Sequence, residues 1–569
     1  MCIDWQVPVE MSDGAVLRAD IYRPVEQGRY PVILSHGVYA KGLPFNGPIY
    51  RMQWNKLVEK DPSVLEGSTN KYQAWEVTDP ERWVPHGYAI VRVDSRGAGW
   101  SPGYLDPRSV QEFSDVCDSV EWAGLQPWST GKVGIMGISY YAVMGWAAAA
   151  RWPPHLAALI AWEGFNDQYR DALYHGGILS EFTRRWQPTQ INPIQYGHGE
   201  RAPLNPNTGQ SVAGPVTLSE EELERNRADY YGAIKQHPLD DQWHRERRTD
   251  VSRITVPLLS AANWGGQGIH PRGNFKGYVE ASSEHKWLEA HGDTHWTHFY
   301  SAYGRDLQRR FFDHFLKGLD NDWDLTPRVQ LNIRHPDERF VWRGENEWPL
   351  ARTRWTRFHL HPDLSLREEP PTRETDMVYE ALGDGLLFTL PARSENLEVT
   401  GPMAATLYIK SSTPDADLFL VVRLFDPDGE EVTFEGSTDP NTPIANGWLR
   451  ASHRALDPER SRPWQPYHPH DRVEPLEPGG IYELKVEIVP SCVVVPPGFR
   501  LGLSVRGKDY EYGGKLDEYG ETFYYATRGT GGMTHDDPDN RPREVFDNEV
   551  TLLVGPKHAS HLLVPVIPS

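Results

Sequence analysis

The sequence predicts an α/β fold with a largely parallel sheet, followed by a separate β-rich region. Short apolar runs alternate with helix-length segments up to about residue 320, which is the pattern of βαβ units. Beyond about residue 340 the apolar runs are short and β-rich, and clusters of Pro, Gly and Asp separate them, as in a β-sandwich. A chain of 569 residues also exceeds one ordinary domain of about 100 to 200 residues. We therefore expect several domains.

The elements of the first region follow from the apolar runs in order. The predicted strands are residues 30–37, 88–97, 132–140, 156–164, 255–263 and 286–292, and the predicted crossover helices are residues 111–126 and 140–152. Between about residues 165 and 250 the sheet pattern stops, and segments rich in Tyr, Trp, Arg and His follow, with residues 219–237 expected to be helical. Ligands of open α/β sheets bind beyond the carboxyl ends of the strands, so this segment is expected to form a helical cap there.

The second region is expected to form a jelly-roll-like β-sandwich. Its predicted strands include residues 406–412, 418–425, 482–490, 499–505 and 550–555, and residues 426–429 (Asp-Pro-Asp-Gly) predict a hairpin turn. The expected division of the chain is therefore an α/β domain over 1–165 and 251–335, a cap insertion over 166–250, and a β-sandwich domain over 336–569.

Composition restricts the partners. The formal net charge of −21 would repel phosphate backbones and anionic lipid surfaces, so no nucleic-acid or membrane partner is expected. The three cysteines Cys2, Cys117 and Cys492 have no metal-ligand or disulfide spacing. The N-terminal segment has no apolar stretch typical of a signal peptide, and no apolar run reaches about 18 residues. A cytoplasmic protein is expected, and a homo-oligomer is left open.

The strongest motif lies where the predicted strand at 132–140 meets an apolar helix. The segment Gly137-Ile138-Ser139-Tyr140 sits at this strand-to-helix turn, which is the context of the nucleophile elbow of α/β-hydrolases. There the serine hydroxyl is exposed, and the amide of Tyr140 points toward a developing oxyanion. Two readings stay open locally, because Ser139 is also a suitable helix N-cap and Tyr141 replaces the second glycine of the general motif.

Around this elbow the chain resembles the cocaine-esterase, α-amino-acid-ester-hydrolase and X-prolyl dipeptidyl-peptidase (S15-type) family of serine hydrolases. The elbow of that family is Gly-x-Ser-Tyr followed by another large residue. Further matching segments occur in order at residues 36–39 (His-Gly-Val-Tyr), 94–103 (Asp-Ser-Arg-Gly-Ala-Gly-Trp-Ser-Pro-Gly) and 292–295 (Gly-Asp-Thr-His). The resemblance implies that Ser139 is the nucleophile, that His295 is its base, and that Tyr39 and the Tyr140 amide form the oxyanion hole. The alternative for Tyr39 is that it only covers the sheet edge.

The histidines near His295 raise a metal-site alternative. His291, His295 and His298 are spaced by four and three residues, which would align them on one helical face. Gly292 interrupts a helix there, and no carboxylate or cysteine set accompanies the histidines in the sequence. We therefore expect neither a metal nor a cofactor.

The acid of the expected triad is not evident. The resemblance places an aspartate where this chain has Gly266, in Asn263-Trp264-Gly265-Gly266. Glu163, at the carboxyl end of the strand after the nucleophile's helix, is the preferred substitute, with Asp167 and Asp293 as weaker candidates. The alternatives are that Glu163 only binds a cap arginine, or that the site is a dyad without an acid.

Together these features predict a hydrolase that cleaves a small-molecule carboxylic ester or amide through an acyl-enzyme on Ser139. An X-prolyl or amino-acyl peptidase is one alternative, in which Glu163 or Glu181 would hold the substrate amino group. An acyltransferase is another, because it would use the same residues. A catalytically impaired, hydrolase-like binding protein is the third.

Overall fold

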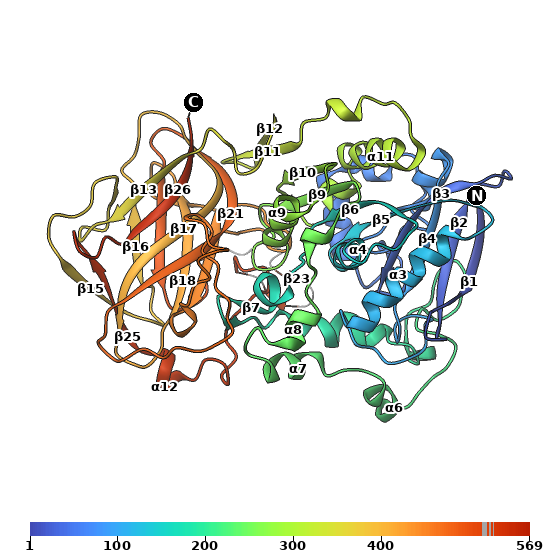
Figure 1. Ribbon diagram of the computed structural model, residues 1–569, viewed down its shortest axis with the longest axis horizontal. Coiled ribbons are helices and arrows are strands. Elements are labelled where there is room, and N and C mark those ends of the chain that lie inside the picture. The colour runs from blue at the N-terminus through green and yellow to red at the C-terminus, as the bar shows by residue number, and fades with distance from the viewer. Residues whose placement is uncertain (515–520, 523–524, 527, 569) are drawn as a thin grey trace.

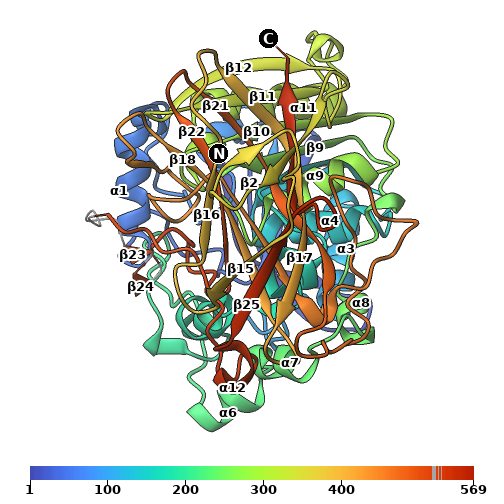
Figure 2. The ribbon, with the colours of Figure 1, turned by 90° about the vertical axis from the view of Figure 1, so that its left-hand side faces the viewer.

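The chain folds into two lobes that lie side by side, an α/β lobe and a β-sandwich lobe (Figure 1). We analysed a computed structural model, which describes residues 1–514, 521–522, 525–526 and 528–568. Viewed from the sandwich end, the strands of the sandwich lie in front of the helices of the α/β lobe (Figure 2). Both predicted fold types are confirmed.

The α/β lobe is built on a ten-stranded sheet with the order β1-β2-β4-β3-β5-β6-β9-β10-β11-β12. The strands from β4 to β11 pair in parallel, whereas β1, β2 and β12 pair antiparallel with their neighbours. The strands of this sheet are β1 (Cys2–Glu10), β2 (Val16–Arg23), β3 (Tyr30–Gly37), β4 (Ala89–Asp94), β5 (Ser129–Ile138), β6 (Leu156–Trp162), β9 (Leu258–Asn263), β10 (Lys286–His291), β11 (Val329–His335) and β12 (Arg339–Glu345).

Helices cover both faces of this sheet. On β5, a Cβ at Gly134 would meet Phe312 of α11, whereas the next residue, Ile135, contacts Gly145 of α4. Successive side chains of a strand point to opposite faces, so α4 and α11 lie on opposite sides. The helices of the lobe outside the cap are α1 (Arg51–Lys60), α2 (Pro80–Trp83), α3 (Val110–Gly124), α4 (Tyr140–Ala149), α9 (Pro271–Glu280), α10 (Thr297–Tyr300) and α11 (Ala302–Lys317).

The segment between β6 and β9 consists of short helices and turns with one small hairpin. The helix expected over 219–237 is split in two, because Asn226 ends α6 and the Asp229 side chain caps a new helix by accepting from the Gly232 amide. The elements of this segment are β7 (Tyr174–His175), β8 (Ile178–Leu179), α5 (Phe182–Trp186), α6 (Glu220–Arg225), α7 (Tyr230–Gln236) and α8 (Gln242–Glu246).

The second lobe is an antiparallel β-sandwich with its own apolar core. The predicted hairpin is confirmed, because residues 426–429 join β18 to β19 and Gly429 has a φ of 94°. Strand β12 belongs to the first sheet, which therefore extends beyond residue 335, and the exact domain division stays a prediction. The elements after β12 are β13 (Arg354–Leu360), β14 (Leu366–Arg367), β15 (Thr375–Glu380), β16 (Leu386–Thr389), β17 (Leu397–Ser411), β18 (Asp417–Phe425), β19 (Glu431–Val432), β20 (Ala445–Arg450), β21 (Tyr482–Val495), β22 (Arg500–Arg506), β23 (Glu521–Thr522), β24 (Tyr525–Ala526), α12 (Arg543–Phe546), β25 (Glu549–Val554) and β26 (His561–Ile567).

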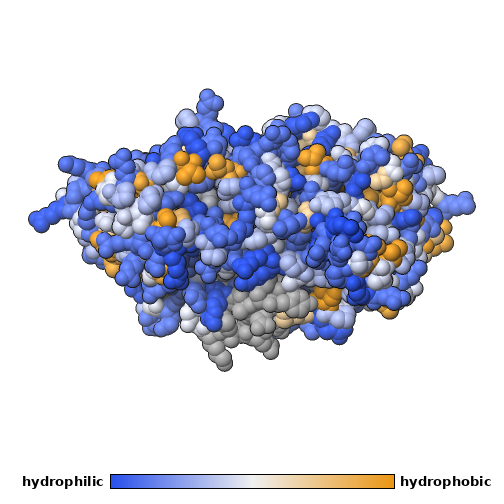
Figure 3. Space-filling model, turned by 90° about the horizontal axis from the view of Figure 1, so that it is seen from below, coloured by the Kyte–Doolittle hydropathy of each residue, from blue (hydrophilic) through white to orange (hydrophobic). Residues whose placement is uncertain are grey.

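The surface is mainly hydrophilic. On the face seen in Figure 3, apolar side chains form small separate groups. In the described part of the chain, none of the helices combines the length and the apolar character needed to span a bilayer.

Candidate active site

Five neighbouring parallel strands deliver side chains to one edge of the α/β sheet. Tyr39 follows β3, Ser139 follows β5, Glu163 follows β6, His270 follows β9, and His295 follows β10. These strands are adjacent in the order β3-β5-β6-β9-β10, so their carboxyl ends bring the five residues together, as is typical of open α/β sheets.

Ser139 has the strained backbone of a nucleophile elbow. Its φ of 56° and ψ of −110° are unusual for a residue with a side chain. Its amide donates to the carbonyl oxygens of Trp162 and Glu163 at 3.0 Å each, which fixes the turn against β6. A Cβ at Gly137 would lie 2.4 Å from the Cβ of Tyr141, so glycine is required before the serine.

His270 is a site residue that the sequence analysis missed. Its Nε2 lies 3.0 Å from Ser139 Oγ. Its Nδ1 is buried and has no hydrogen-bond partner. Burial lowers the pKa of His270 to about 3, with a further contribution from the charge of His295. His270 is therefore a neutral ring in contact with the serine, without a carboxylate to orient it.

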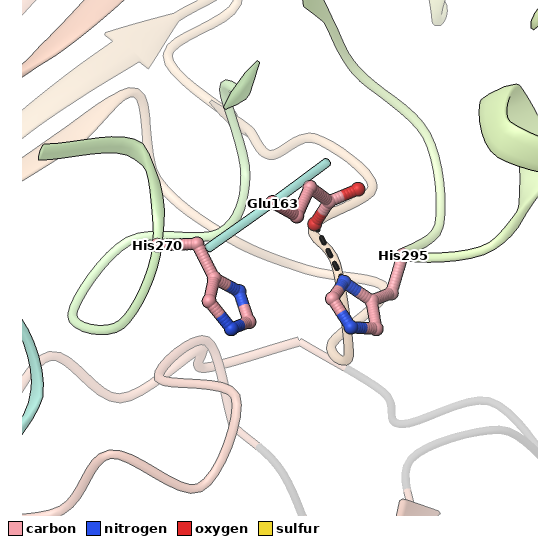
Figure 4. A group of neighbouring side chains, drawn as sticks. All are labelled: Glu163, His270 and His295. Atoms are coloured by element: carbon pink, nitrogen blue, oxygen red, sulfur yellow. Dashed lines mark hydrogen bonds and ion pairs between the residues drawn. The ribbon is translucent and has the colours of Figure 1, made fainter. Parts of the chain in front are cut away.

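Glu163 lies against His295 as an acid lies against the base of a triad. Glu163 Oε2 is 2.6 Å from His295 Nδ1, and Figure 4 shows this contact beside the ring of His270. The two imidazole rings are stacked, with centroids 5.0 Å apart and planes 7° apart. His295 and His270 thus share one side of the site, and Glu163 bonds to His295.

A second carboxylate, that of Glu76, is hydrogen-bonded to the other ring nitrogen of His295. Glu76 Oε1 lies 3.1 Å from His295 Nε2. Burial alone would lower the pKa of His295, but Glu163 and Glu76 outweigh burial and raise that pKa to about 10. The imidazolium form of His295 is therefore favoured in this arrangement.

Glu163 is also bound by a second histidine. Its Oε1 lies 3.1 Å from His291 Nε2, and His291 Nδ1 lies 2.6 Å from Glu289 Oε2. Burial acts to raise the pKa of Glu163, but the charges and hydrogen bonds of His295 and His291 hold it well below its usual range. Burial likewise opposes the charge of His291, but Glu289 and Glu163 raise its pKa to about 9. His291 is therefore a buried cation that keeps Glu163 ionised.

Tyr39 lines the same pocket as Ser139. The indole Nε1 of Trp186 donates to the Tyr39 hydroxyl at 3.0 Å, which leaves the phenolic hydrogen free to donate. Tyr140 is the first residue of α4, where amides have no acceptor within the helix. The Tyr140 side chain points away and donates its hydroxyl to Glu112 at 2.5 Å. Only the amide of Tyr140 is thus suited to an oxyanion.

Gly266 cannot be replaced by an aspartate without a rearrangement. A Cβ at Gly266 would lie 2.9 Å from Ser437 Oγ. Ser437 belongs to the second lobe, and its hydroxyl donates to Glu163 Oε2 at 3.1 Å. Its carbonyl accepts from the His295 amide at 3.0 Å. Ser437 therefore fills the space next to the position where the family places its acid, and it binds the carboxylate of Glu163.

The weaker acid candidates have other partners. The Asp167 carboxylate pairs with Arg170 and Arg248. The Asp293 side chain accepts from the Thr294 amide. The cap-arginine alternative for Glu163 also finds no support, because the hydrogen bonds of its carboxylate in the described structure go to His291, His295, Ser437 and Asn263.

Two groups of described side chains lie close enough together to share a metal ion. Donor atoms of Glu163, His270 and His295 lie within 4.8 Å of one another, as do those of Glu289, His291 and His298. The rings of His270 and His295 are stacked, and so are those of His291 and His298, with centroids 4.7 Å apart. The three histidines do not share a helical face, because His291 ends β10 and His295 lies in the loop before α10, in keeping with the interruption expected at Gly292.

Both lobes and the cap line the pocket above Ser139. In the cap, Phe182 and Trp186 face this pocket, whereas Tyr169 is a core residue. The second lobe contributes Ser437, Thr438, Thr442, Asn446, Trp448, Asp509, Tyr510, Gly529, Thr530, Gly531 and Met533.

A strained serine at the carboxyl edge of a parallel sheet, beside a carboxylate-bound histidine, defines the class of α/β serine hydrolases. Residues 13–300 match the X-Pro dipeptidyl-peptidase (S15 family) domain, and residues 321–562 match the X-Pro dipeptidyl-peptidase C-terminal non-catalytic domain. The chain therefore belongs to the S15 family, whose members hydrolyse esters and X-Pro peptides, and the resemblance inferred from the sequence is confirmed.

Individual relatives span the whole chain. The chain is 24% identical to the cocaine esterase of a Rhodococcus species, over 99% of this chain and 98% of that protein. A crystal structure of a CocE/NonD family hydrolase from Staphylococcus aureus is 30% identical and has a TM-score of 0.83, covering 99% of this chain and 94% of the other. An α-amino acid ester hydrolase, at 15% identity with a TM-score of 0.68 over 99% and 96% of the two chains, shares the fold.

Proposed function

We propose that Ser139 attacks the carbonyl carbon of a small-molecule ester or amide. His295 accepts the serine proton and returns it to the leaving group, while Glu163 orients the imidazole and stabilises its cation. The Tyr39 hydroxyl and the Tyr140 amide donate to the oxyanion. Water then hydrolyses the acyl-enzyme on Ser139.

The observation that carries this proposal is the 2.6 Å contact between Glu163 Oε2 and His295 Nδ1. It supports Glu163 as the acid that orients His295 in a chain that has glycine at position 266. His270 also contacts Ser139, but its unpartnered Nδ1 leaves the cation that it would form without a carboxylate. His295 is therefore the better general base, and we assign His270 to holding the serine hydroxyl in the resting enzyme.

The amino-acyl or X-prolyl peptidase is the second candidate, because a buried carboxylate oxygen faces the pocket. Glu76 lines the pocket, and its Oε2 has no hydrogen-bond partner. Glu163 is occupied by histidines, and Glu181 pairs with Arg184 at 2.6 Å. Glu76 is thus the carboxylate best suited to receive a substrate amino group.

The cytoplasm is the compartment that we propose. Cys2, Cys117 and Cys492 are free thiols in the described structure, and thiols persist in reducing compartments.

Labelling by a fluorophosphonate probe, together with hydrolysis of a 4-nitrophenyl ester, tests the proposed function. The wild type is expected to be labelled and to turn over, and Ser139→Ala is expected to do neither. A wild type that neither reacts with the probe nor hydrolyses the ester would favour an impaired binding protein. Product analysis with added alcohols or amines separates hydrolysis from acyl transfer.

A further inference from the structure

Glu76 has no part in the proposed triad, although it touches the base. Its carboxylate is only 4% exposed. One oxygen, Oε1, lies 3.1 Å from His295 Nε2, and the other, Oε2, is buried without a hydrogen-bond partner. A buried, half-satisfied carboxylate at a reactive site needs an explanation, because an unmade hydrogen bond on a charged group is costly.

The nitrogen that Glu76 occupies is the one that the reaction needs. When the acid binds Nδ1 of the histidine, Nε2 takes the proton of the serine. Here Glu163 binds Nδ1 and Glu76 binds Nε2, while the Ser139 hydroxyl bonds to His270 instead. With a carboxylate on each side, both nitrogens of His295 carry hydrogen, and such a ring cannot accept another proton.

The backbone holds Glu76 in this position. Its φ is 59°, a strained value for a residue with a side chain. Its carbonyl accepts from the amide of Ile138 at 3.0 Å, directly before the nucleophile. The Tyr300 hydroxyl donates to the next carbonyl, that of Val77, at 3.1 Å. The contact with His295 is therefore built into the fold of this loop.

The pocket around Glu76 favours a positive charge. Among the described residues that line it, Glu76 and Asp509 are acidic and none is Lys or Arg, while the charge of His295 is paired with Glu163. Asp509 is hydrogen-bonded to His535, so Glu76 is the carboxylate with an oxygen left to pair with a cation. Five large aromatic side chains also face it, namely Tyr39, Phe182, Trp186, Trp448 and Tyr510. Carboxylates and aromatic faces both attract organic cations.

We propose that Glu76 blocks the base in the free enzyme by holding Nε2 of His295. A cationic group of the substrate, of the organic ammonium class, removes this block by pairing with Glu76. This inference rests on the proposed function, in which His295 is the base. When the cation pairs with Glu76, the Nε2–H···Oε1 hydrogen bond breaks and the proton leaves Nε2 for solvent. The freed lone pair then accepts the hydroxyl proton of Ser139 as Oγ bonds to the carbonyl carbon.

The block of His295 by Glu76 predicts a specific dependence of activity on pH. The ionisable groups that face this pair are Glu163 and His270 on the side of His295, and Tyr39, Tyr141 and Tyr300 on the side of Glu76. The pKa of His295, raised to about 10 by these carboxylates, means that a neutral substrate meets a protonated base at pH 7. Activity on such a substrate is expected to rise with pH until His295 loses its proton.

A pair of isosteric esters with and without a permanent charge tests this inference. The 4-nitrophenyl esters of 4-(trimethylammonio)butanoate and of 5,5-dimethylhexanoate differ by a quaternary nitrogen in place of carbon, and neither acyl group titrates. For the wild type, kcat/KM at pH 7 is expected to favour the cationic ester. In Glu76→Gln that ratio is expected to fall about tenfold, while activity on the neutral ester rises about tenfold, since each pKa unit removed from the base is worth a factor of ten. Intrinsic differences in ester reactivity cancel between the two proteins.

Asp509→Asn is the matched control. Asp509 is the other carboxylate of the pocket, but it is already hydrogen-bonded to His535, so its neutralisation is expected to keep the ratio. An unchanged ratio in Glu76→Gln, or a ratio lost in Asp509→Asn instead, overturns the proposed block by Glu76. Labelling of Ser139 would still leave the proposed function intact. If Glu76→Gln does not fold, the pH profiles of the wild type decide. A pH profile of kcat/KM with a lower midpoint for the cationic ester supports the block by Glu76, and equal midpoints for the two esters overturn it. A wild type without Ser139-dependent labelling overturns both proposals.

Discussion

The hydroxyl of Ser437 donates to Glu163 at 3.1 Å, and this bond joins the two lobes at the proposed acid. Ser437 follows β19 in the sandwich lobe, whereas Glu163 ends β6 of the α/β sheet. The same serine accepts from the His295 amide through its carbonyl. The proposed acid and base are therefore both held by a residue of the second lobe.

Replacing Glu163 by Gln is expected to lower kcat by roughly 10³ to 10⁴, because an amide does not stabilise the imidazolium and favours the wrong tautomer. Steady-state hydrolysis of a 4-nitrophenyl ester measures the loss. Asp293→Asn removes the charge of a nearby rival carboxylate and is expected to change kcat little. Equal losses in both variants would contradict the assignment of Glu163.

His291→Gln is expected to lower kcat and leave KM nearly unchanged, because His291 is buried behind Glu163 and acts through it. The double variant Glu163→Gln/His291→Gln is then expected to be no slower than Glu163→Gln alone, since residues that act as one unit are not additive. Losses that add fully in the double variant would show that His291 acts independently of Glu163.

The free energy of unfolding is expected to fall as pH rises from about 6.5, the usual pKa of histidine, through about 9, the folded pKa of His291. A pKa that is raised in the folded state stabilises the protein below the unfolded pKa, and this contribution is lost above the folded one. For His291 it is on the order of 3 kcal/mol. Urea unfolding between pH 6 and 10 measures it. His291→Gln is expected to reduce this slope, while the raised pKa of His295, about 10, supplies the part that remains. A variant with the same slope as the wild type would rule out His291 as the source.

Tyr39→Phe is expected to reduce kcat by roughly 10² to 10³, the usual effect of losing one oxyanion donor. The Trp186 indole keeps its place but loses its acceptor, so some loss of stability is also expected. Tyr141→Phe, on the ring next to Tyr39, is the matched control for deletion of a hydroxyl. Wild-type activity in Tyr39→Phe would leave Tyr39 with the role of covering the sheet edge.

Gly266→Asp is expected to destabilise the protein by about 1 to 3 kcal/mol, as overpacking of a filled site does. A Cβ there would approach Ser437 Oγ to 2.9 Å. Thermal unfolding measures the change, and adding Ser437→Gly is expected to recover part of it. If Gly266→Asp is as stable as the wild type, the contact with Ser437 does not explain the glycine.

Local patterns were enough to predict the parallel strands and the nucleophile elbow. The runs at 30–37 and 132–140 correspond to β3 and β5, and Ser139 has the strained turn expected between a strand and a helix. Glu163 could be predicted as a site residue for the same reason, because a residue at the end of a buried parallel strand must lie at the edge of the sheet that binds ligands.

The remaining site residues give no such signal. Glu76 lies in an irregular segment without hydrophobic periodicity, His270 follows a glycine-rich turn, and Ser437 is 274 positions from Glu163. Their places depend on how loops of the two lobes pack together, which periodicity does not encode. The role of His291 gives no signal either, because its partners Glu163 and Glu289 lie after β6 and on β10, and the alignment of these strands is a property of the folded sheet.

Trp448, Asn446 and Tyr510 of the sandwich line the pocket, whereas the proposed reactive side chains belong to the α/β lobe. The contacts with substrate and the reacting groups therefore lie on different lobes. Substitutions in the sandwich can therefore redirect which ester is accepted without altering the reactive side chains of the α/β sheet. Exchange of the loops around these residues between homologues is accordingly a route to new substrate selectivity. Truncation to the α/β lobe would leave Ser139 in a solvent-exposed pocket without these lining residues.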